Sequence, residues 1–280
     1  MIKFLTRIFF ISIFISGLLF LVKDYNPFNK NDFSRIIKNG EIRVVTRFGP
    51  TNYYEIQNEE NGYTYDLISD FAKFIGVKLK VITMDNLQQA KIALNNREVD
   101  MLANMGVVND VKISYSYNKV SHYIVYNSDY MIKPNQISDL RKSRIEIIDS
   151  SSIKDSFNIF TKTIDINYTI AKDKNIDEMI NLLKDNEIDF TVVSYNELQI
   201  YNKYYPQIKI AFKIRENINS SWAIPENTSY VFENKISEYF TELLKDNKLK
   251  NIYMKHFTDK LQYTFVGTRS FLSDLINIFP

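Results

Sequence analysis

The sequence predicts an α/β fold built as two lobes, because short strands alternate with helices in two successive stretches of the chain. In the first stretch, strands are expected at residues 41–46, 78–84 and 99–103, with helices at 65–75 and 87–96. Helices between strands imply parallel pairing through right-handed crossovers. Ligands in such sheets bind at the carboxyl ends of the strands. We therefore expect a binding site just after Thr46 and just after Ala103, where Met105 follows.

The two helices of this stretch are predicted from apolar residues that recur at helical spacing. One stripe consists of Leu67, Ile68, Phe71 and Ile75, and the other of Leu87, Ala90 and Leu94. Residues three and four positions apart lie on one face of a helix, so each stripe can pack on a sheet. Gly76 stands where a left-handed residue would end the first helix.

The second stretch repeats this plan. Strands are expected at 144–148, 188–193 and 208–212, and helices at 151–160, 175–184 and 197–204. In both stretches an acidic residue, an apolar one and an Asp lead into a buried strand, at Glu98-Val99-Asp100 and at Glu187-Ile188-Asp189. Two such lobes, joined by crossings near residues 125–132 and 212–221, would form a hinged cleft. We assign residues 40–128 and 216–260 to lobe 1, and 129–215 to lobe 2.

The remaining segments connect or extend the lobes. Residues 25–39 are interpreted as a linker with a short helix at 33–38, and residues 104–120 as an irregular segment. A strand is expected at 121–132, a helical turn at 138–141 and a short strand at 221–224. Two helices, at 231–244 and 248–257, follow, and residues 261–280 are expected to form a connector helix.

Composition narrows the range of functions. With 280 residues and 45% hydrophobic content, the chain can fill the cores of two modest lobes. The net charge of +2 is too small to indicate a nucleic-acid partner. The lack of cysteine excludes disulfides and zinc–thiolate sites, and the only histidines, His122 and His256, lie far apart in sequence. We therefore expect no metal and no other cofactor, and we interpret both histidines as ordinary surface or packing residues.

The N-terminus predicts export. Lys3 and Arg7 precede an apolar run that begins at Ile8 and ends at Val22. A run of about 15 residues behind a positive flank fits a secretory signal better than a bilayer span of about 20. No small-residue cleavage site is evident, so residues 1–24 are either a signal peptide or an uncleaved membrane anchor. A buried core helix is the third, less favoured alternative.

Several short motifs together indicate a family. Gly40-Glu-Ile-Arg-Val-Val-Thr-Arg, Gly62-Tyr-Thr-Tyr-Asp-Leu and Val99-Asp-Met-Leu-Ala resemble the family 3 periplasmic solute-binding proteins. A narrower set resembles, in order, the N-terminal module of the membrane-bound lytic murein transglycosylase F family: Pro50-Thr-Asn-Tyr-Tyr, Gly76-Val-Lys-Leu, Asp85-Asn-Leu, Ser194-Tyr-Asn-Glu-Leu, Tyr204-Tyr-Pro, Trp222-Ala-Ile-Pro and Thr268-Arg-Ser-Phe-Leu. The resemblance covers roughly residues 33–280. It implies a bilobed, type II periplasmic-binding-protein fold with two mixed sheets joined by a hinge.

The chain departs from the transglycosylase pattern in one respect. In that family a catalytic domain follows the Thr-Arg motif and supplies a glutamate in a Glu-Ser context and a Gly-Leu-Met-Gln-like segment. Neither motif occurs in the 280 residues. Glycan cleavage needs a carboxylic acid with a raised pKa beside the glycosidic oxygen. We therefore expect no catalytic residues and no enzymatic activity in this chain.

The resemblance also implies ligand-binding positions in lobe 1. Family members grip a ligand with aromatic residues after the first strand, which correspond to Tyr53 or Tyr54, and with an Arg that corresponds to Lys112. Lys offers a point charge where Arg forks two hydrogen bonds onto a carboxylate, so tight α-amino-acid recognition is in doubt. Tyr65 and Asp66 at the start of the first helix are further candidates. A structural role is the favoured explanation for Asp66, and for Lys112 an exposed loop position is an equal alternative.

In lobe 2 the candidates lie at helix starts. Ser151 and Ser152 begin a helix whose N–H groups attract an anion, although capping alone would explain serines there. The family's amine-binding Asp corresponds to Ser194, so that charge is absent. Asn196 and Glu197 match the transglycosylase-type module, and helix capping would again explain Asn196.

These observations lead to one preferred function and three alternatives. We expect a periplasmic, membrane-associated module, held on the inner membrane by its anchor or peripheral to the outer membrane after cleavage, that senses or docks a small polar ligand such as an amino acid or a muropeptide. Its further partners would be the membrane, through the N-terminal segment, and peptidoglycan or a transglycosylase. The alternatives are the substrate-binding subunit of an amino-acid ABC transporter, a fragment of an active transglycosylase, and a degenerate remnant without a ligand.

Overall fold

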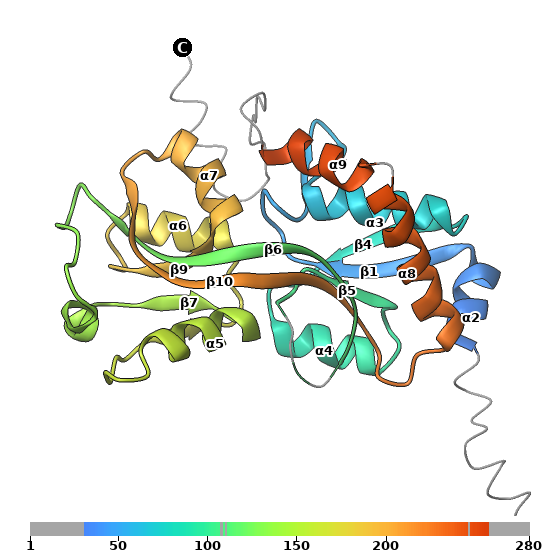
Figure 1. The fold of residues 1–280 in the computed structure, drawn as a ribbon, viewed down its shortest axis with the longest axis horizontal. Coiled ribbons are helices and arrows are strands. Elements are labelled where there is room, and N and C mark those ends of the chain that lie inside the picture. The colour runs from blue at the N-terminus through green and yellow to red at the C-terminus, as the bar shows by residue number, and fades with distance from the viewer. Residues whose placement is uncertain (1–30, 107–108, 110, 246, 258–280) are drawn as a thin grey trace, which may run out of the picture.

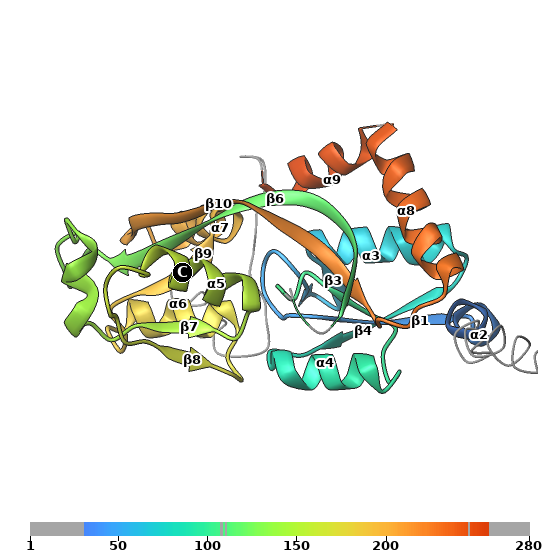
Figure 2. The same ribbon diagram turned by 60° about the horizontal axis from the view of Figure 1, so that its bottom comes forward.

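The structure is a computed structural model that describes residues 31–106, 109, 111–245 and 247–257. Two α/β lobes lie side by side, and two long strands, β6 (Lys112–Asn127) and β10 (Ile208–Ile224), run from one lobe into the other (Figures 1 and 2). The predicted α/β fold with two lobes is confirmed.

Lobe 1 is built on a parallel three-stranded unit. Strand β1 (Glu41–Thr46) lies between β4 (Lys78–Thr83) and β5 (Met101–Ala103) and pairs in parallel with both. The other elements of this lobe are the hairpin β2 (Tyr54–Ile56) and β3 (Glu59–Asn61), and the helices α2 (Asn31–Asn39), α3 (Tyr63–Phe74), α4 (Leu87–Asn95), α8 (Tyr230–Lys245) and α9 (Lys248–Phe257). The parallel pairing brings the ends of β1 and β5 to the same edge of the sheet, facing lobe 2.

Lobe 2 repeats the alternation of strands and helices. It contains the 3-10 helix η2 (Ile137–Lys142), the strands β7 (Glu146–Ile148), β8 (Thr169–Ala171) and β9 (Thr191–Ser194), and the helices α5 (Ser151–Phe160), α6 (Ile176–Lys184) and α7 (Tyr195–Tyr204). Strands β7 and β8 pair in parallel, while β9 pairs antiparallel with β6.

The long strands join the lobes in one sheet. The order of this six-stranded sheet is β4-β1-β5-β10-β6-β9, so the main sheet runs through both lobes where we expected one sheet in each, and β7 and β8 form a separate two-stranded sheet. On β6, Tyr117 packs in the core of lobe 1 and Ile124 in that of lobe 2. On β10, Ile214 packs in the core of lobe 2 and Trp222 in that of lobe 1. This packing favours a crossing on β6 that precedes the predicted residues 125–132.

Both lobes contain the same Arg–Asp contact at the start of their sheets. In lobe 1, Asp100 accepts hydrogen bonds from the Arg43 main-chain N at 2.8 Å and from its Nε at 3.1 Å. In lobe 2, Asp189 accepts them from the Arg144 main-chain N at 2.6 Å and from its Nε at 3.2 Å. Asp100 and Asp189, the Asp residues of the two repeated motifs, therefore have a structural role.

The predicted elements differ from the structure mainly at the crossings. The bounds of β1, α5 and α9 agree with the prediction. The hairpin β2–β3 and strand β8 were not predicted. The prediction of an irregular segment up to residue 120 was wrong, because β6 begins at Lys112, and β10 is one continuous strand where we expected two.

Three predicted features lie outside the described residues: the signal or anchor helix at 1–24, the connector helix at 261–280 and the Thr268-Arg269 motif. Among the residues that the structure does describe, no helix is long and apolar enough to cross a membrane.

Candidate functional site

A cavity lies between the two lobes, at the edge where β1 and β5 end. It encloses about 80 Å³, and both lobes and both crossing strands contribute to its wall. The lining from lobe 1 includes Arg47, Thr51, Asn52, Asn104, Met105 and Gly106, and that from lobe 2 includes Ser150, Ser152, Ser194, Asn196 and Glu197. From the crossing strands come Asn118, His122, Asn219, Ser220 and Ser221. The position agrees with the expectation of a site after Thr46 and after Ala103.

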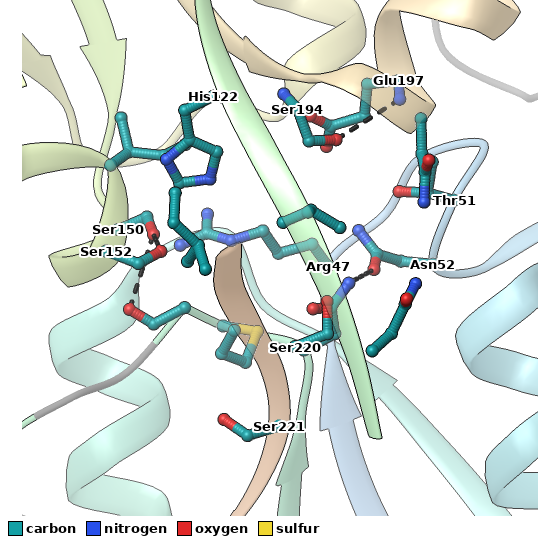
Figure 3. Close-up of a pocket in the computed structure, with 18 of the residues that line it drawn as sticks. Arg47, Thr51, Asn52, His122, Ser150, Ser152, Ser194, Glu197, Ser220 and Ser221 are labelled. Atoms are coloured by element: carbon teal, nitrogen blue, oxygen red, sulfur yellow. Dashed lines mark hydrogen bonds between the residues drawn. The ribbon is translucent and has the colours of Figure 1, made fainter. Parts of the chain in front are cut away.

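Arg47 is the central charged group of this cavity. Its side chain extends from the end of β1 between Asn52 and the Ser150–Ser152 pair (Figure 3). Nη1 donates to the main-chain oxygen of Asp85 at 2.7 Å, and Nη2 donates to the main-chain oxygen of Asp149 in lobe 2. Arg47 is 4% exposed, and this burial lowers the pKa of its guanidinium, while the charges of Asp85, Asp149 and Glu197 act in the opposite direction.

Further hydrogen bonds hold the two lobes together around the cavity. The main-chain N of Ser152 donates to the main-chain oxygen of Gly106 at 3.1 Å. At the rims, the Asn86 amide donates to the Asp173 carboxylate at 2.9 Å, and the Tyr253 hydroxyl donates to the Asn196 amide oxygen at 3.1 Å. The lobes are therefore in contact on both sides of the cavity, as in a closed conformation.

The serines at the start of α5 face the cavity. Ser150 precedes the helix but makes no side-chain capping bond, so capping does not explain it. Its hydroxyl lies 3.1 Å from that of Ser152 and 3.5 Å from the Gly106 oxygen. Figure 3 shows Ser150 and Ser152 side by side. Ser151, the other predicted serine, is outside the set of lining residues.

The start of α7 contributes Ser194 and Glu197. They form a capping box: the Ser194 N donates to Glu197 Oε2 at 2.7 Å, and the Glu197 N donates to Ser194 Oγ at 3.3 Å. Burial raises the pKa of the Glu197 carboxyl, while the bonds from Ser194 and the charge of Arg47 oppose this shift. Asn196 does not cap this helix, because the cap is Ser194 and the Asn196 oxygen accepts the bond from Tyr253.

His122 lies in the cavity wall, which the sequence did not suggest. It is 4% exposed, and its Nδ1 is 3.0 Å from the Ser156 hydroxyl. Burial, with a smaller contribution from the charge of Arg215, lowers the pKa of His122 to about 4. The imidazole is therefore neutral at pH 7 and offers a polar, uncharged surface.

Besides Ser151, five predicted site residues lie outside the lining of this cavity. The Tyr53 hydroxyl donates to Glu55 at 2.7 Å, and the Tyr65 hydroxyl donates to Glu60 at 2.9 Å. Tyr54 is buried against Ile200. These tyrosines pack the hairpin β2–β3 and its contact with α7, and none of them lines the cavity.

Asp66 and Lys112 are also engaged elsewhere. Asp66 Oδ2 lies 2.7 Å from His256 Nε2 and 2.6 Å from Lys255 Nζ, which fixes α9 on α3. Lys112 Nζ is 2.5 Å from Glu233 on α8. Both pairs stabilise lobe 1, and the structural alternative that we weighed for these two residues fits the geometry. Of the predicted set, Met105, Ser152, Ser194, Asn196 and Glu197 line the cavity.

The cavity offers hydrogen-bonding groups rather than ligands for a metal. Within the described parts of the chain, no three His, Asp or Glu side chains gather closely enough to hold a metal ion. Most of the lining is made of amides and hydroxyls, with Arg47 and Glu197 as the charged groups. Such a surface can bind a polar solute by many neutral hydrogen bonds.

Comparison with known proteins agrees with this geometry. The chain is 26% identical over 253 residues to the membrane-bound lytic murein transglycosylase F of Pseudomonas putida strain KT2440, a match that covers 88% of this chain and 52% of that protein. The protein of the same name from Pseudomonas syringae pv. tomato is also 26% identical, with 88% and 51% covered. The predicted resemblance to the solute-binding module of transglycosylase F is confirmed. No family model matches the chain.

The chain spans about half the length of the curated transglycosylase F relatives that it matches. Among solved structures, an ancestral arginine-binding protein bound to arginine is 22% identical with a TM-score of 0.69, covering 78% of this chain and 99% of that one. The substrate-binding protein of an amino acid ABC transporter is 21% identical with a TM-score of 0.67, covering 78% and 99%. At these identities the likeness shows the fold alone, which is that of the type II periplasmic binding proteins.

Proposed function

We propose that this chain is a periplasmic, membrane-associated solute-binding module that closes its two lobes on a small polar ligand. The ligand would be a peptidoglycan-derived peptide or an amino acid, and the module would be the non-catalytic, regulatory half of a lytic transglycosylase-like protein. The observation that carries the proposal is the cavity between the lobes, which both lobes line and which Arg47 crosses. The name of the relatives, membrane-bound lytic murein transglycosylase F, supports the peptidoglycan connection.

The chemistry of the cavity favours a ligand with a carboxylate and amide groups. Two of the five N–H groups of Arg47 donate to main-chain carbonyls, so three remain for a carboxylate or a carbonyl oxygen. The start of α5 adds a favourable environment for negative charge. Glu197 is the only carboxylate among the described lining residues, and the Ser194 main chain already occupies one of its oxygens. The cavity therefore offers fewer hydrogen-bond partners to an ammonium group than to a carboxylate.

The size of the cavity indicates hinge motion. A space of about 80 Å³ is smaller than the roughly 300–1,000 Å³ of typical ligand pockets. A peptide would therefore enter only after the lobes separate, and the lobes would close around it less fully than they do in this structure. Ligand binding then shifts the population between open and closed forms by its difference in affinity for them.

A panel of ligands tests the binding function. The purified full-length chain, in detergent, is heated with L- and D-amino acids and with muropeptides, one at a time. A ligand that binds only the native state at 100 times its Kd stabilises the protein by about 2.7 kcal/mol, so at least one muropeptide should raise the Tm. Affinity for free L-amino acids alone would favour the transporter subunit, and a flat response would favour a degenerate remnant.

The absence of catalysis needs a separate test. We expect isolated sacculi incubated with the protein to release no anhydro-muropeptides, with an active lytic transglycosylase as the positive control. Release of these products would refute the non-catalytic assignment and favour an active transglycosylase.

A further inference from the structure

The two lobes also meet in an apolar contact outside the lining of the interlobe cavity. Tyr54 on β2 of lobe 1 packs against Ile200 on α7 of lobe 2, and these residues are 5% and 3% exposed. We call the contact between Tyr54 and Ile200 the interlobe latch. Neither residue belongs to the core of lobe 1 or of lobe 2. Five partly buried apolar residues pack around the pair: Phe48, Ile56, Tyr204, Tyr205 and Phe257.

The backbone beside the latch is fitted closely to lobe 2. Gly49 has a φ of +144°, and a Cβ at this position would lie only 3.2 Å from Cγ2 of Ile176 on α6. The Gly49 N–H donates to the main-chain oxygen of Tyr53 at 2.9 Å, next to Tyr54 in the chain. The loop that leads into the latch therefore touches α6 while Tyr54 touches α7.

Separation of the lobes would break the latch. Tyr54 and Ile200 come from different lobes, so a motion that moves α7 away from the hairpin β2–β3 exposes apolar surface of both. Burial of apolar surface stabilises the closed conformation, and this stabilisation needs no ligand. The same holds for the polar contacts of Arg47 and Ser152, because each donates to a main-chain oxygen of the opposite lobe. Protein groups alone are therefore sufficient to hold the lobes closed.

The closed conformation is also too tight for a peptide. Its interlobe cavity of about 80 Å³ is well below the roughly 300–1,000 Å³ of typical ligand pockets. A peptide needs the lobes to stay further apart, and the same separation breaks the contact between Tyr54 and Ile200. Peptide binding and the intact latch therefore compete with each other.

We propose that the interlobe latch is an autoinhibitory contact, which keeps the ligand-free chain closed and which a bound ligand holds broken. The lobes separate to admit the ligand and then close around it only in part. The bound form is therefore more open than the free form. The latch lowers the apparent affinity, because only the fraction of molecules with a broken latch can bind. The inference rests on the proposed function and deepens it, because it describes how the interlobe site is regulated.

A distance between the lobes tests the resting state of the chain. Nitroxide labels are attached at Gln88→Cys and Lys172→Cys, two exposed positions in a chain without native cysteine. They flank the interlobe hydrogen bond between Asn86 and Asp173 and leave it in place. Pulsed electron paramagnetic resonance on the full-length chain in detergent, without added ligand, should give one short distance. Ile200→Ala should add a longer distance and lower the ratio of closed to open molecules by about tenfold.

Matched controls separate the latch from the lobe cores. Leu198 lies on the same helix as Ile200 and is 2% exposed, but it packs in the core of lobe 2. Leu198→Ala should therefore keep the parent distance. In lobe 1, Tyr54→Ala should open the chain as Ile200→Ala does, and it provides the test if Ile200→Ala does not fold. Tyr53→Ala should not open it, because the Tyr53 ring packs against Tyr65 of its own lobe.

Calorimetry with a muropeptide tests the autoinhibition itself. The probe is N-acetylmuramyl-L-alanyl-D-isoglutamine, added to the full-length chain. Ile200→Ala and Tyr54→Ala should bind it more tightly than the parent, by up to about tenfold, because less of each variant is closed. Leu198→Ala should bind it with the parent affinity. In the labelled parent chain, the probe should lengthen the distance between the lobes.

The outcomes separate the latch from the proposed function. A long distance in the ligand-free parent, or equal distances in the latch and control variants, would overturn the latch and leave the proposed function in place. Weaker probe binding by both latch variants would show that the bound form keeps the contact, which would also overturn the autoinhibition. Failure of the probe to bind any variant, with no rise in Tm for any member of the ligand panel, would overturn the proposed function. The distances in the ligand-free chain would then still decide whether the latch holds it closed.

Discussion

Arg47, the first residue after β1 in lobe 1, donates a hydrogen bond to the main-chain oxygen of Asp149 at the end of β7 in lobe 2. The same guanidinium holds the Asp85 carbonyl of its own lobe. One buried side chain therefore links the carboxyl-terminal edges of both sheets across the interlobe cavity. Substitution of Asp149 would leave its main-chain carbonyl in place. The link therefore depends on the side chain of Arg47.

Replacing Arg47 should destabilise the closed protein. Arg47→Met leaves two carbonyl groups without their charged donor, and hydrogen bonds to charged groups contribute about 1.5–3 kcal/mol each. We expect a loss of about 2 kcal/mol or more in the free energy of unfolding, measured with urea. Arg47→Lys keeps the charge but cannot donate to both carbonyls as the planar guanidinium does. Its loss in free energy of unfolding should therefore lie between zero and that of Arg47→Met. The exposed Arg141→Met is the control, with an effect below about 0.5 kcal/mol. Equal stabilities of the Arg47 and Arg141 variants would contradict the linking role.

Closure of the lobes should depend on Gly106. Its φ is +66°, and a Cβ there would overlap with the hydroxyls of Ser150 and Ser152 in lobe 2. Gly40 has nearly the same φ, +64°, but no atom within 4 Å of such a Cβ. Gly106→Ala therefore combines backbone strain of about 1 kcal/mol with an interlobe clash, whereas Gly40→Ala has the strain alone.

The absence of native cysteines allows closure to be measured directly. Asn86 and Asp173 are hydrogen-bonded to each other across the lobes. Cysteines introduced at these two positions can be joined by a short bifunctional thiol reagent. We expect efficient crosslinking in the parent pair and in Gly40→Ala, and a much lower yield in Gly106→Ala. The same yield in both glycine variants would show that the clash is relieved without opening.

His122 should make stability depend on pH. Its folded-state pKa of about 4 lies below the ordinary value of 6.5, so between these pH values the unfolded chain binds a proton that the folded chain does not. The free energy of unfolding should therefore fall as the pH decreases from 6.5 to 4, by up to about 1.4 kcal/mol per pH unit. His122→Asn, whose amide can meet the Ser156 hydroxyl, should lack this component.

The difference between parent and His122→Asn isolates the histidine, because other groups titrate in the same range. Glu197 has a raised pKa, so it acts in the opposite direction and stabilises the folded chain as the pH falls. Urea unfolding of both proteins at pH 7, 5.5 and 4.5 gives the comparison. Parallel pH profiles would rule out a buried, neutral His122.

The sequence predicted the lobes well and the binding surface poorly, for one physical reason. Periodicity and caps depend on local neighbours, so β1, α5 and α9 were predicted with their bounds. At the crossings, Asn118, Asn219 and Ser220 broke the apolar pattern of β6 and β10 and suggested irregular segments. These polar residues line the cavity, so the failure of strand prediction coincides with the candidate site.

Arg47 and His122 were missed for a related reason. A single Arg after a strand and an isolated His carry no local signal that distinguishes them from surface residues. Their burial arises when residues more than 30 positions apart come together, as in the bonds of Arg47 to Asp149 and of His122 to Ser156. A search for polar residues directly after both parallel strands would have found Arg47, because Thr46 and Ala103 already marked that edge.

The repeated Arg–Asp contact allows the same substitution to be compared in the two lobes. The side chain of Asp100 is 1% exposed and also pairs with Arg35, whereas that of Asp189 is 19% exposed and pairs with Arg144. Breaking a buried ion pair by removing one partner costs about 3–5 kcal/mol, while a more exposed pair contributes about 1 kcal/mol or less. Asp100→Asn should therefore destabilise the protein by about 3 kcal/mol, and Asp189→Asn by about 1 kcal/mol.

Urea unfolding followed separately in each lobe checks this difference. Trp222, the single tryptophan of the chain, packs in the core of lobe 1, so its fluorescence reports that lobe. Asp100→Asn should shift the fluorescence transition to lower urea. If the lobes unfold independently, Asp189→Asn should leave that transition in place and shift the circular dichroism signal alone. Equal shifts of the fluorescence transition in both variants would mean that the continuous six-stranded sheet couples the lobes into one cooperative unit.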